Sequence, residues 1–257
     1  MHHYDRNFYT TAENCGVEFV NFDRLKRYLD IACLRFRIYL DFLLINRNLF
    51  DRVYLCDMFD TAVQHDPFTT DFGDSLYLCD EGIKIKDDSI NTYWISKCIS
   101  DMEANSNDKS FIFSEEIKKN IFEKNILNSG LVAGSIDNMI KYCEAMSKMI
   151  DNSTFNLNAF YDQGFHNLIV HSGYLKGKVN YTIEKVNSEL FASIGIYITR
   201  TDNIEHNDKI IDFGNIKRDD AFPGILHQFE RSLKIKNSLL HYCPNKENFS
   251  DYIRNVK

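Results

Sequence analysis

The sequence predicts an α/β fold with a mixed sheet. A short apolar run, VYLCD at residues 53–57, is bounded by polar residues and is typical of a buried strand. The segment 25–46 before it has apolar residues at steps of three and four, which is the spacing of an amphipathic helix. Strands and helices continue to alternate toward the C-terminus, with more strands in the second half. This alternation predicts layers of helices packed on a sheet.

The individual elements are expected in a definite order, without an internal repeat. Turn residues and changes of hydrophobic period mark their ends. The expected strands are 17–22, 53–57, 75–85, 126–135, 191–199 and 209–213. The expected helices are 25–46, 91–102, 115–125, 137–150 and 162–172, and the segment 224–240 closes the domain.

Composition predicts one compact domain over residues 1–257. The 257 residues are 44% hydrophobic and 26% charged, which is ordinary for a globular protein and enough for a sizeable core. With only 3 Pro and 11 Gly, long disordered linkers are not expected.

The charge pattern argues against a nucleic-acid partner. The formal net charge is −7, and no dense run of Lys and Arg offers the basic patch that displaces counterions from a phosphate backbone. An anionic substrate would therefore need a bound cation.

The seven cysteines do not indicate a zinc site or a complete set of disulfides. Their number is odd and no C-x-x-C pair occurs. Cys33, Cys56 and Cys143 lie in apolar runs, so we expect them to be buried thiols.

We expect the chain as given to be soluble and to lack a membrane segment. No segment approaches about 18 uninterrupted apolar residues, and the first 15 residues lack the apolar core of a signal peptide. The compartment stays open: the secretory pathway or Golgi if an upstream anchor exists, and the cytoplasm otherwise.

Two aspartates follow the predicted strand 53–57. Asp57 stands at its carboxyl end, the edge where ligands bind in open α/β sheets, and Asp60 comes three residues later. Carboxylate oxygens suit Mg²⁺ or Mn²⁺, and substrate phosphates commonly complete the coordination of such ions. Asp60 also fits a simpler interpretation as an Asx-turn or helix cap before Thr61.

A metal-dependent phosphatase of the haloacid-dehalogenase type would use similar residues. It requires D-x-D-x-[TV] after an apolar strand, with the first Asp as nucleophile. VYLCDMFDT has one residue too many between Asp57 and Asp60, which redirects the second side chain.

Four segments together resemble the ordered motifs of GT-A-type nucleotide-diphospho-sugar glycosyltransferases. They are DMFDTAVQHDPF, LNSGLVAGS, YDQGFHNLIVH and ILHQFER, and the resemblance covers about residues 35–231. It implies a Rossmann-type domain with a mixed, mainly parallel central sheet flanked by helices. It also implies transfer of a sugar from a nucleotide-diphosphate sugar to a glycan, protein or small-molecule acceptor, with Mn²⁺ or Mg²⁺ as cofactor.

The resemblance assigns roles residue by residue. It implies that the metal ligands are Asp57, Asp60 and His227. It implies that the donor is bound by Arg35, Asp57, Asn128 and Gly130, with Ser129 beside them. It implies that the transferred sugar is faced by Asp162 and Gln163. A guanidinium such as that of Arg35 matches phosphate oxygens in bidentate fashion, whereas Arg37 is two positions on and faces elsewhere.

Most of these residues also have a structural interpretation. Asp162 and Gln163 could cap the helix that follows them, and Gly130 and Gly134 could serve close backbone approach in a strand. A lone histidine beside apolar residues more often makes a hydrogen bond in the core, and we expect this of His65, His166 and His171. For Asp66 and Pro67 we expect a plain turn as readily as any ligand role.

The chain departs from the GT-A pattern at its start. Such domains open with a strand and helix that form half of the nucleotide pocket, but only residues 1–16 precede the expected strand 17–22. We therefore expect either that the first βα unit is missing or that residues 1–8 provide an irregular substitute. The alternative to a transferase is thus a GT-A-like protein that binds without catalysis, and the metal-dependent phosphatase is the third hypothesis.

Overall fold

The computed structural model describes residues 13, 17–20, 31–58, 60–69, 73–153, 161–185, 188–195, 211–212, 215–216 and 222–242. The chain divides into two compact units. One consists of Tyr28–Leu239, and the other of Met1–Arg27 with Leu240–Lys257. The elements that carry the predicted site residues belong to the first unit.

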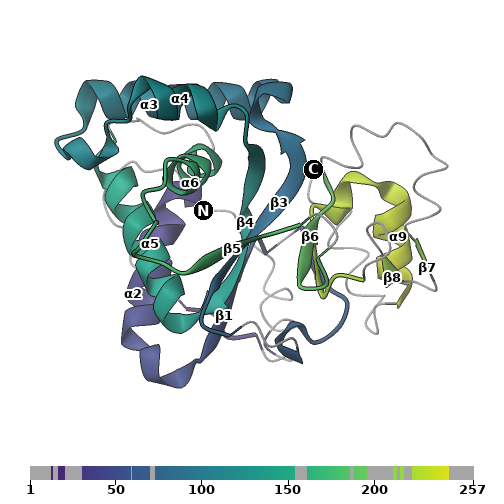
Figure 1. The fold of residues 1–257 in the computed structure, drawn as a ribbon. Helices are drawn as coiled ribbons and strands as arrows, with labels where there is room; N and C mark the ends of the chain where they lie inside the picture. Colours follow the sequence, from purple (N-terminus) through teal and green to yellow (C-terminus); the bar gives the residue numbers. More distant parts are fainter. Residues whose placement is uncertain are drawn as a thin grey trace. The chain divides into compact units, whose positions relative to one another are not determined.

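Helices and strands alternate through most of the first unit (Figure 1). The helices are α2 (Ile31–Ile45), α3 (Ser89–Asn105), α4 (Glu115–Ile121), α5 (Ile136–Asp151), α6 (Asp162–His171) and α9 (Leu233–Tyr242). The strands are β1 (Arg52–Cys56), β2 (Thr61–Val63), β3 (Leu76–Lys84), β4 (Asn125–Ser135), β5 (Tyr181–Glu184), β6 (Phe191–Ser193), β7 (Ile211–Asp212), β8 (Asn215–Ile216) and β9 (Ile225–His227). Short 3₁₀ helices follow several of them: η1 (Arg47–Leu49), η2 (Pro67–Thr69), η3 (Ile85–Asp87), η4 (Lys109–Phe111) and η5 (Phe229–Arg231).

A four-stranded sheet in the order β1-β4-β3-β5 forms the centre of this unit. Figure 1 shows α2, α5 and α6 on one face of this sheet. α2 buries Cys33, Phe36, Leu40 and Leu43, residues spaced by three and four, against this layer. Phe36 meets Tyr142 of α5 edge to face, with 5.9 Å between the ring centroids. The helical layer therefore packs on the sheet by the periodicity that the sequence shows.

Strand β4 is covered on both faces. Its residues from Ile126 to Gly134 are all buried. Val132 packs into the core shared with the helices, whereas Leu131 and Ala133 pack with Phe191 and Ile225 on the opposite face. Because successive side chains of a strand point to opposite faces, β4 joins the helical layer to a second sheet.

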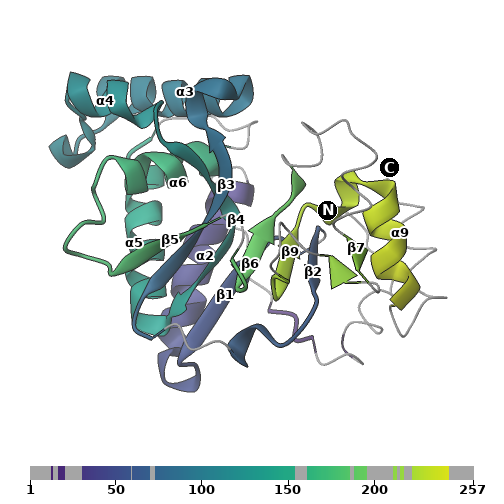
Figure 2. The same ribbon diagram turned by 45° about the vertical axis from the view of Figure 1, so that its right-hand side comes forward.

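The second sheet is small and has the order β2-β9-β6 (Figure 2). β2 runs antiparallel to β9, with Thr61 opposite His227, and β6 runs parallel to β9, with Ser193 opposite His227. His227 is therefore the point where residues distant in sequence meet. A separate two-stranded ribbon pairs β7 with β8.

The structure confirms an α/β fold with mixed sheets flanked by helices, but the expected mainly parallel character is wrong for the described strands. β1 and β3 both run antiparallel to β4, and the described parallel pairs are β3 with β5 and β6 with β9. The reason is that the connection between β3 and β4, which contains α3 and α4, leaves and re-enters the sheet at the same end. Backbone bonds from Ile85 to Lys124 (2.9 Å) and from Lys86 to Phe122 (3.1 Å) hold the two ends together, so β4 must run back along β3.

Two expected strands are also corrected. Residues 17–20 have no regular secondary structure, and Val17 and Val20 are exposed, so they do not form a buried strand face. Residues 21–22 lie outside the described part. The expected strand 191–199 is a strand only over Phe191–Ser193, and 196–199 lie outside the described residues as well.

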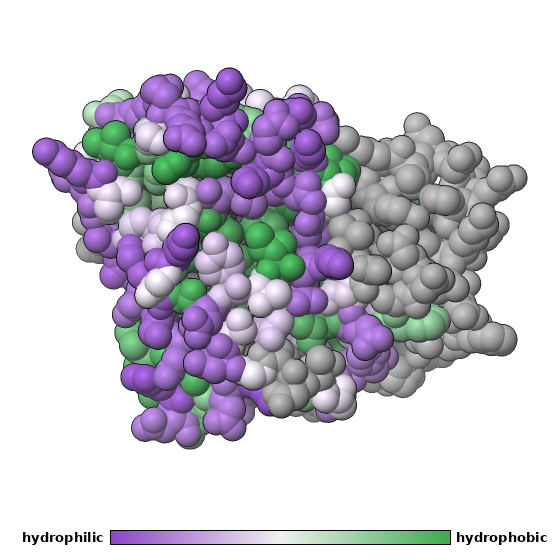
Figure 3. Space-filling model, viewed as in Figure 1, coloured by the Kyte–Doolittle hydropathy of each residue, from purple (hydrophilic) through white to green (hydrophobic). Residues whose placement is uncertain are grey.

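Among the described residues, no helix is long and apolar enough to cross a membrane. On the face shown in Figure 3, the outer surface of α3 and α4 is mainly hydrophilic. Apolar residues gather lower on this face, over α6 and β5. A hollow of about 480 Å³ lies between the C-terminal end of α6 and the strands β3 and β5, lined in part by Leu127, Val170, His171, Tyr181 and Ile183.

Candidate metal centre

Asp57, Asp60 and His227 converge at the junction of the two sheets. His227 Nε2 lies 3.4 Å from Asp57 Oδ2 and 3.4 Å from Asp60 Oδ2. One ligand atom from each of the three residues lies within 4.8 Å of the other two, close enough to share one ion. The structure thus brings together the three residues that the sequence suggested as metal ligands.

Backbone pairing explains this convergence. The Asp57 N–H donates to the Gly130 carbonyl at 3.0 Å, which holds the residue after β1 against β4. Asp60 directly precedes β2, and the Gln228 N–H donates to its carbonyl at 2.7 Å, which holds it beside the end of β9. Because a strand follows Asp60, its interpretation as a helix cap is wrong.

His227 is almost fully buried, at 1% exposure, yet neither of its ring nitrogens makes a hydrogen bond of normal geometry with the residues that the structure describes. Asp60 Oδ1 is likewise buried without a hydrogen-bond partner. Buried polar atoms in a folded protein nearly always have partners. A cation coordinated between the two carboxylates and one ring nitrogen would give that nitrogen a partner and balance the charge of the aspartates, so the donor set fits a divalent ion.

The electrostatics of the three residues are those of a site that attracts positive charge. Burial by itself lowers the pKa of His227, but the Asp57 and Asp60 carboxylates outweigh it and raise this pKa to about 9. Burial raises the pKa of Asp57, but His227 and Arg35 outweigh it and lower this pKa to about 2. Without an ion, a proton on His227 therefore partly balances the two aspartates.

Gly130 makes room for the cluster. A Cβ at this position would lie 2.4 Å from Asp57 Oδ2 and 2.9 Å from His227 Cε1, so any larger residue would displace one of them. Gly134, in the same strand, meets backbone instead: its Cβ would lie 2.8 Å from the Ser75 carbonyl oxygen. Gly134 thus has the structural role of close backbone approach, whereas Gly130 lies against the cluster.

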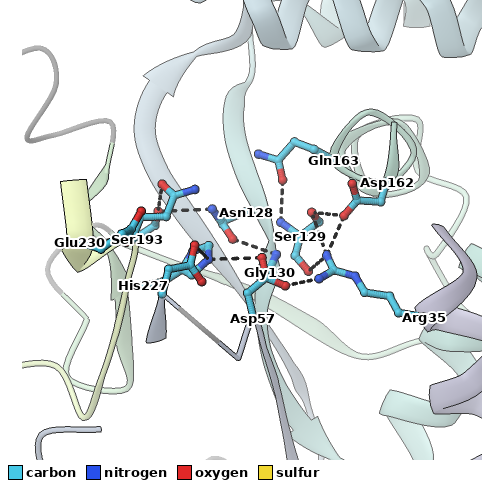
Figure 4. A network of polar contacts seen from close by, with 12 residues as sticks. Arg35, Asp57, Asn128, Ser129, Gly130, Asp162, Gln163, Ser193, His227 and Glu230 are labelled. Carbon is cyan, nitrogen blue, oxygen red and sulfur yellow. Dashed lines mark hydrogen bonds and ion pairs between the residues drawn. The ribbon is translucent and has the colours of Figure 1, made fainter. Parts of the chain in front are cut away.

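Arg35 of α2 joins Asp57 to Asp162 (Figure 4). Its Nη1 donates to Asp57 Oδ1, and its Nη2 donates to Asp162 Oδ2 at 2.6 Å and to the Ser129 carbonyl at 3.2 Å. Burial lowers the pKa of Arg35, but Asp162 and Asp57 outweigh it and raise the pKa further above its usual value. Arg37, in contrast, pairs with Asp151 and does not join the site.

Asp162 and Gln163 begin α6 and face β4. Ser129 Oγ donates to Asp162 Oδ2 at 2.8 Å, and the Ser129 N–H donates to Gln163 Oε1 at 2.7 Å. Burial raises the pKa of Asp162, while Arg35 and Ser129 act in the opposite direction. The helix begins at Asp162 and Tyr161 occupies the N-cap position, so Asp162 and Gln163 lie in the first turn of α6, where both side chains contact β4.

Asn128 contacts two residues that the sequence analysis did not identify as site residues, Glu81 of β3 and Ser193 of β6. Asn128 Nδ2 donates to Glu81 Oε1 and lies 3.3 Å from Ser193 Oγ. The available sequence signal for Glu81 was the acidic pair Asp80 and Glu81, which interrupts the apolar run of SLYLCDEGIKI. Its partners, however, become neighbours only through the three-dimensional fold.

The other predicted residues have structural partners. His65 Nε2 lies 3.1 Å from the Phe222 carbonyl, His166 Nδ1 lies 2.6 Å from Tyr142 Oη, and His171 Nε2 lies 2.8 Å from the Asn125 carbonyl. Asp66 accepts from the Phe68 N–H at 2.9 Å and starts the turn that leads into η2, as expected of a turn residue. Cys33 and Cys143 are buried and Cys56 is half-buried, and none of these three cysteines forms a disulfide with another described residue.

Comparisons with family models, curated proteins and solved structures found no match. The resemblance to GT-A enzymes therefore rests on the order of the motifs in this chain.

Proposed function

We propose that this chain is a metal-dependent glycosyltransferase that moves a sugar from a nucleotide-diphosphate sugar to an acceptor. The convergence of Asp57, Asp60 and His227 on one point carries the proposal. Two carboxylates and a histidine are suitable ligands for Mn²⁺, and Mg²⁺ accepts the same carboxylates. The side chain of Asp57 is 36% exposed and that of Asp60 is 25% exposed, so the cluster remains accessible from solvent.

A divalent ion held by these residues supplies positive charge for the departing nucleoside diphosphate. The chain's own residues fix the geometry. Arg35 holds Asp57 on one side and Asp162 on the other, so the candidate ligand and the carboxylate proposed to face the sugar keep a constant separation. Catalysis of this kind depends mainly on positioning and on stabilisation of the leaving group.

The contacts of Asp57 favour a ligand over a nucleophile. Its Oδ1 accepts from Arg35, and its Oδ2 faces His227 at 3.4 Å. A phosphatase nucleophile needs an oxygen directed at the phosphorus atom, whereas both oxygens of Asp57 are directed at cationic or coordinating groups. This arrangement supports the transferase over the phosphatase.

The test measures binding and turnover of a panel of nucleotide sugars by the full chain, with and without Mn²⁺. Calorimetry reports donor binding, and release of nucleoside diphosphate reports transfer to water or to an added acceptor. A generic phosphomonoester serves as the control substrate. Asp137→Asn is the matched control for an aspartate, because Asp137 makes an exposed ion pair with Arg47 away from the cluster.

We expect at least one donor to bind and react only with Mn²⁺ present, and we expect Asp137→Asn to behave as the wild type does. Binding of a donor without turnover would favour the non-catalytic alternative. Release of phosphate from the monoester, with no reaction of any nucleotide sugar, would identify a phosphatase instead.

A further inference from the structure

A buried acidic residue outside the metal cluster connects the two sheets that form it. Glu81 of β3 is 3% exposed. Its Oε1 accepts a hydrogen bond from Asn128 Nδ2 and a longer one, 3.3 Å, from Ser193 Oγ. Asn128 belongs to β4 of the large sheet and Ser193 to β6 of the small sheet, so one carboxylate oxygen binds both sheets.

The backbone of β3 is shaped to direct Glu81 into this junction. The register of β3 against β4 shifts between Asp80 and Lys84, so Glu81 lies in an irregular part of the ladder. Gly82, the next residue, has φ of 76°, and its N–H donates to Asp80 Oδ1 at 2.6 Å. Irregularities of this kind change the direction in which a side chain points. Glycine adopts the positive φ at position 82 without strain.

Each partner of Glu81 leads to a different member of the metal cluster. On one side, Asn128 Oδ1 accepts from the Gly130 N–H at 2.8 Å, and the Gly130 carbonyl accepts from the Asp57 N–H at 3.0 Å. On the other side, Ser193 lies opposite His227 in the pairing of β6 with β9. The carboxylate of Glu81 is thus linked to both Asp57 and His227 through short chains of contacts, of which Figure 4 shows Asn128, Gly130 and Ser193 beside the two cluster residues.

His227 depends on such a support because its Nδ1 makes no hydrogen bond with any described residue. Histidine ligands usually donate their second ring N–H to a carboxylate or carbonyl, which fixes the orientation of the ring. Among the described residues, Nδ1 of His227 has no such partner, and Nε2 faces the carboxylates of Asp57 and Asp60, the other two proposed ligands. The position of the ring is therefore set by the backbone of β9 and by packing, and β9 is held in turn by β6.

We propose that Glu81 is a positioning residue that fixes His227 against Asp57 and Asp60 by tying β6 to β4. This inference rests on the metal role in the proposed function. It assigns no ligand role to Glu81. If the carboxylate of Glu81 only filled space, an apolar residue of similar volume could replace it with little change in stability or in metal affinity. A positioning role predicts a loss of metal affinity instead.

The experiment compares Glu81→Leu, Glu81→Gln and Ser193→Ala with a matched control, Asn138→Ala. Asn138 is also buried, at 2% exposure, and also bridges elements, since its Nδ2 donates to Asp74 Oδ1 at 2.7 Å and its Oδ1 accepts from the Asn180 N–H at 3.2 Å. It touches none of the cluster residues in these bonds. The two readouts are the Mn²⁺ dissociation constant, from the electron paramagnetic resonance signal of free Mn²⁺, and the melting temperature in chelator.

We expect Glu81→Leu to raise the Mn²⁺ dissociation constant by about tenfold or more, the size typical of lost support behind a metal ligand. Glu81→Gln keeps an acceptor oxygen for Asn128 and Ser193, so it should recover most of the affinity. Ser193→Ala removes the hydroxyl that joins Glu81 and Asn128 to β6, so it should also weaken binding. Asn138→Ala should lower the melting temperature while the dissociation constant stays within about twofold of the wild type.

Wild-type Mn²⁺ affinity in Glu81→Leu, or in Ser193→Ala if Glu81→Leu does not fold, would overturn the inference. Equal weakening by Asn138→Ala would do the same, because the effect would then follow stability alone. A wild-type chain that binds no Mn²⁺ would remove the basis of the inference and of the proposed function together. A wild-type chain that binds Mn²⁺ but no nucleotide sugar would refute the proposed function and leave the role of Glu81 intact.

Discussion

Asp60 contributes its charge to the cluster more than it contributes to the fold. Its Oδ1 is buried without a hydrogen bond, and its Oδ2 faces His227. The substitution Asp60→Asn keeps the shape and removes the negative charge that an ion needs. We expect donor turnover to fall by about 100-fold or more, because the ion no longer stays bound, with a melting temperature in chelator within about 2 °C of the wild type. Steady-state kinetics over a range of Mn²⁺ concentrations and thermal melting check this.

The control for this prediction is Asp137→Asn, which should retain both activity and stability. If Asp60→Asn were inactive because it did not fold, Asp60 would be a structural residue and the metal assignment would lose one ligand.

A substitution at Gly130 of β4 tests the same cluster, because this glycine lies against Asp57 and His227. In Gly130→Ala the added Cβ meets Asp57 Oδ2 at 2.4 Å, so the carboxylate must move. We expect the Mn²⁺ affinity to fall by about tenfold and the stability by about 1–3 kcal/mol, the usual cost of overpacking. Gly134→Ala is the control, because its Cβ meets the backbone at Ser75 and Leu76. It should lose stability and keep its Mn²⁺ affinity, and a reversed pattern would contradict the account.

At the residue scale, the sequence located the candidate ligands but not what holds them. Asp57, Asp60 and His227 stand in motifs with recognisable order, and Arg35 stands in a regular helix. Glu81 and Ser193 have no such pattern, since their contact depends on the register shift in β3 and on the packing of β6 against β3 and β4. Such long-range pairings are set by tertiary structure and leave no local spacing in the chain.

At the scale of elements, the packing of α6 on α5 places a histidine in the core. His166 is 0% exposed, and its Nδ1 lies 2.6 Å from Tyr142 Oη. Burial lowers the pKa of His166 to about 3, and the nearby charges of His171 and Arg35 act in the same direction. His166 is therefore neutral in the folded state at neutral pH.

This burial predicts a dependence of stability on pH. The folded pKa of about 3 lies below the unfolded value of 6.5, so the unfolded chain binds more protons between these two values. The contribution of His166 is fully present above pH 6.5 and is lost as pH falls toward 3. Between pH 6.5 and 5 it should decrease by about 2 kcal/mol. Urea unfolding of wild type and His166→Gln at pH 7.0 and 5.0 measures the difference.

Gln can still bond to Tyr142 but does not titrate, so His166→Gln should lose less stability on acidification. His171, whose pKa burial lowers to about 4, remains in both proteins and does not affect the comparison. Equal losses in both proteins would show that His166 does not titrate as its burial implies.

The sequence predicted most elements of the first unit because their hydrophobic periods are strong. The helices α2, α3, α5 and α6 and the strands β1, β3 and β4 lie where the pattern placed them. It did not predict β2, whose three residues TAV are too short to show a period. The GT-A resemblance implied a mainly parallel sheet, whereas β4 runs antiparallel to both β1 and β3. Strand direction depends on where the connecting helices return, which no local pattern records.

At the scale of the whole site, an ion would join the two sheets. Asp57 comes from the large sheet, whereas Asp60 and His227 flank the pairing of β2 with β9 in the small one. Because an ion bound only by the folded state stabilises it, Mn²⁺ at about 100 times its dissociation constant should add about 2.7 kcal/mol. We expect the melting temperature to rise by about 5–10 °C, and to return to its starting value with chelator.

His227→Gln separates this effect from general salt effects, since it removes one of the two ligands that the small sheet supplies to the ion. We expect Mn²⁺ to raise the melting temperature of this variant little or not at all. An equal rise in wild type and variant would place the stabilising ion elsewhere in the protein.

The most direct test of the account is an X-ray structure of the chain crystallised with Mn²⁺, with anomalous scattering used to locate the metal. The account predicts a single strong anomalous peak within about 2.0–2.6 Å of a carboxylate oxygen of Asp57, a carboxylate oxygen of Asp60 and a ring nitrogen of His227. No peak at this position with Mn²⁺ in excess, or a peak held by other residues, would contradict the account.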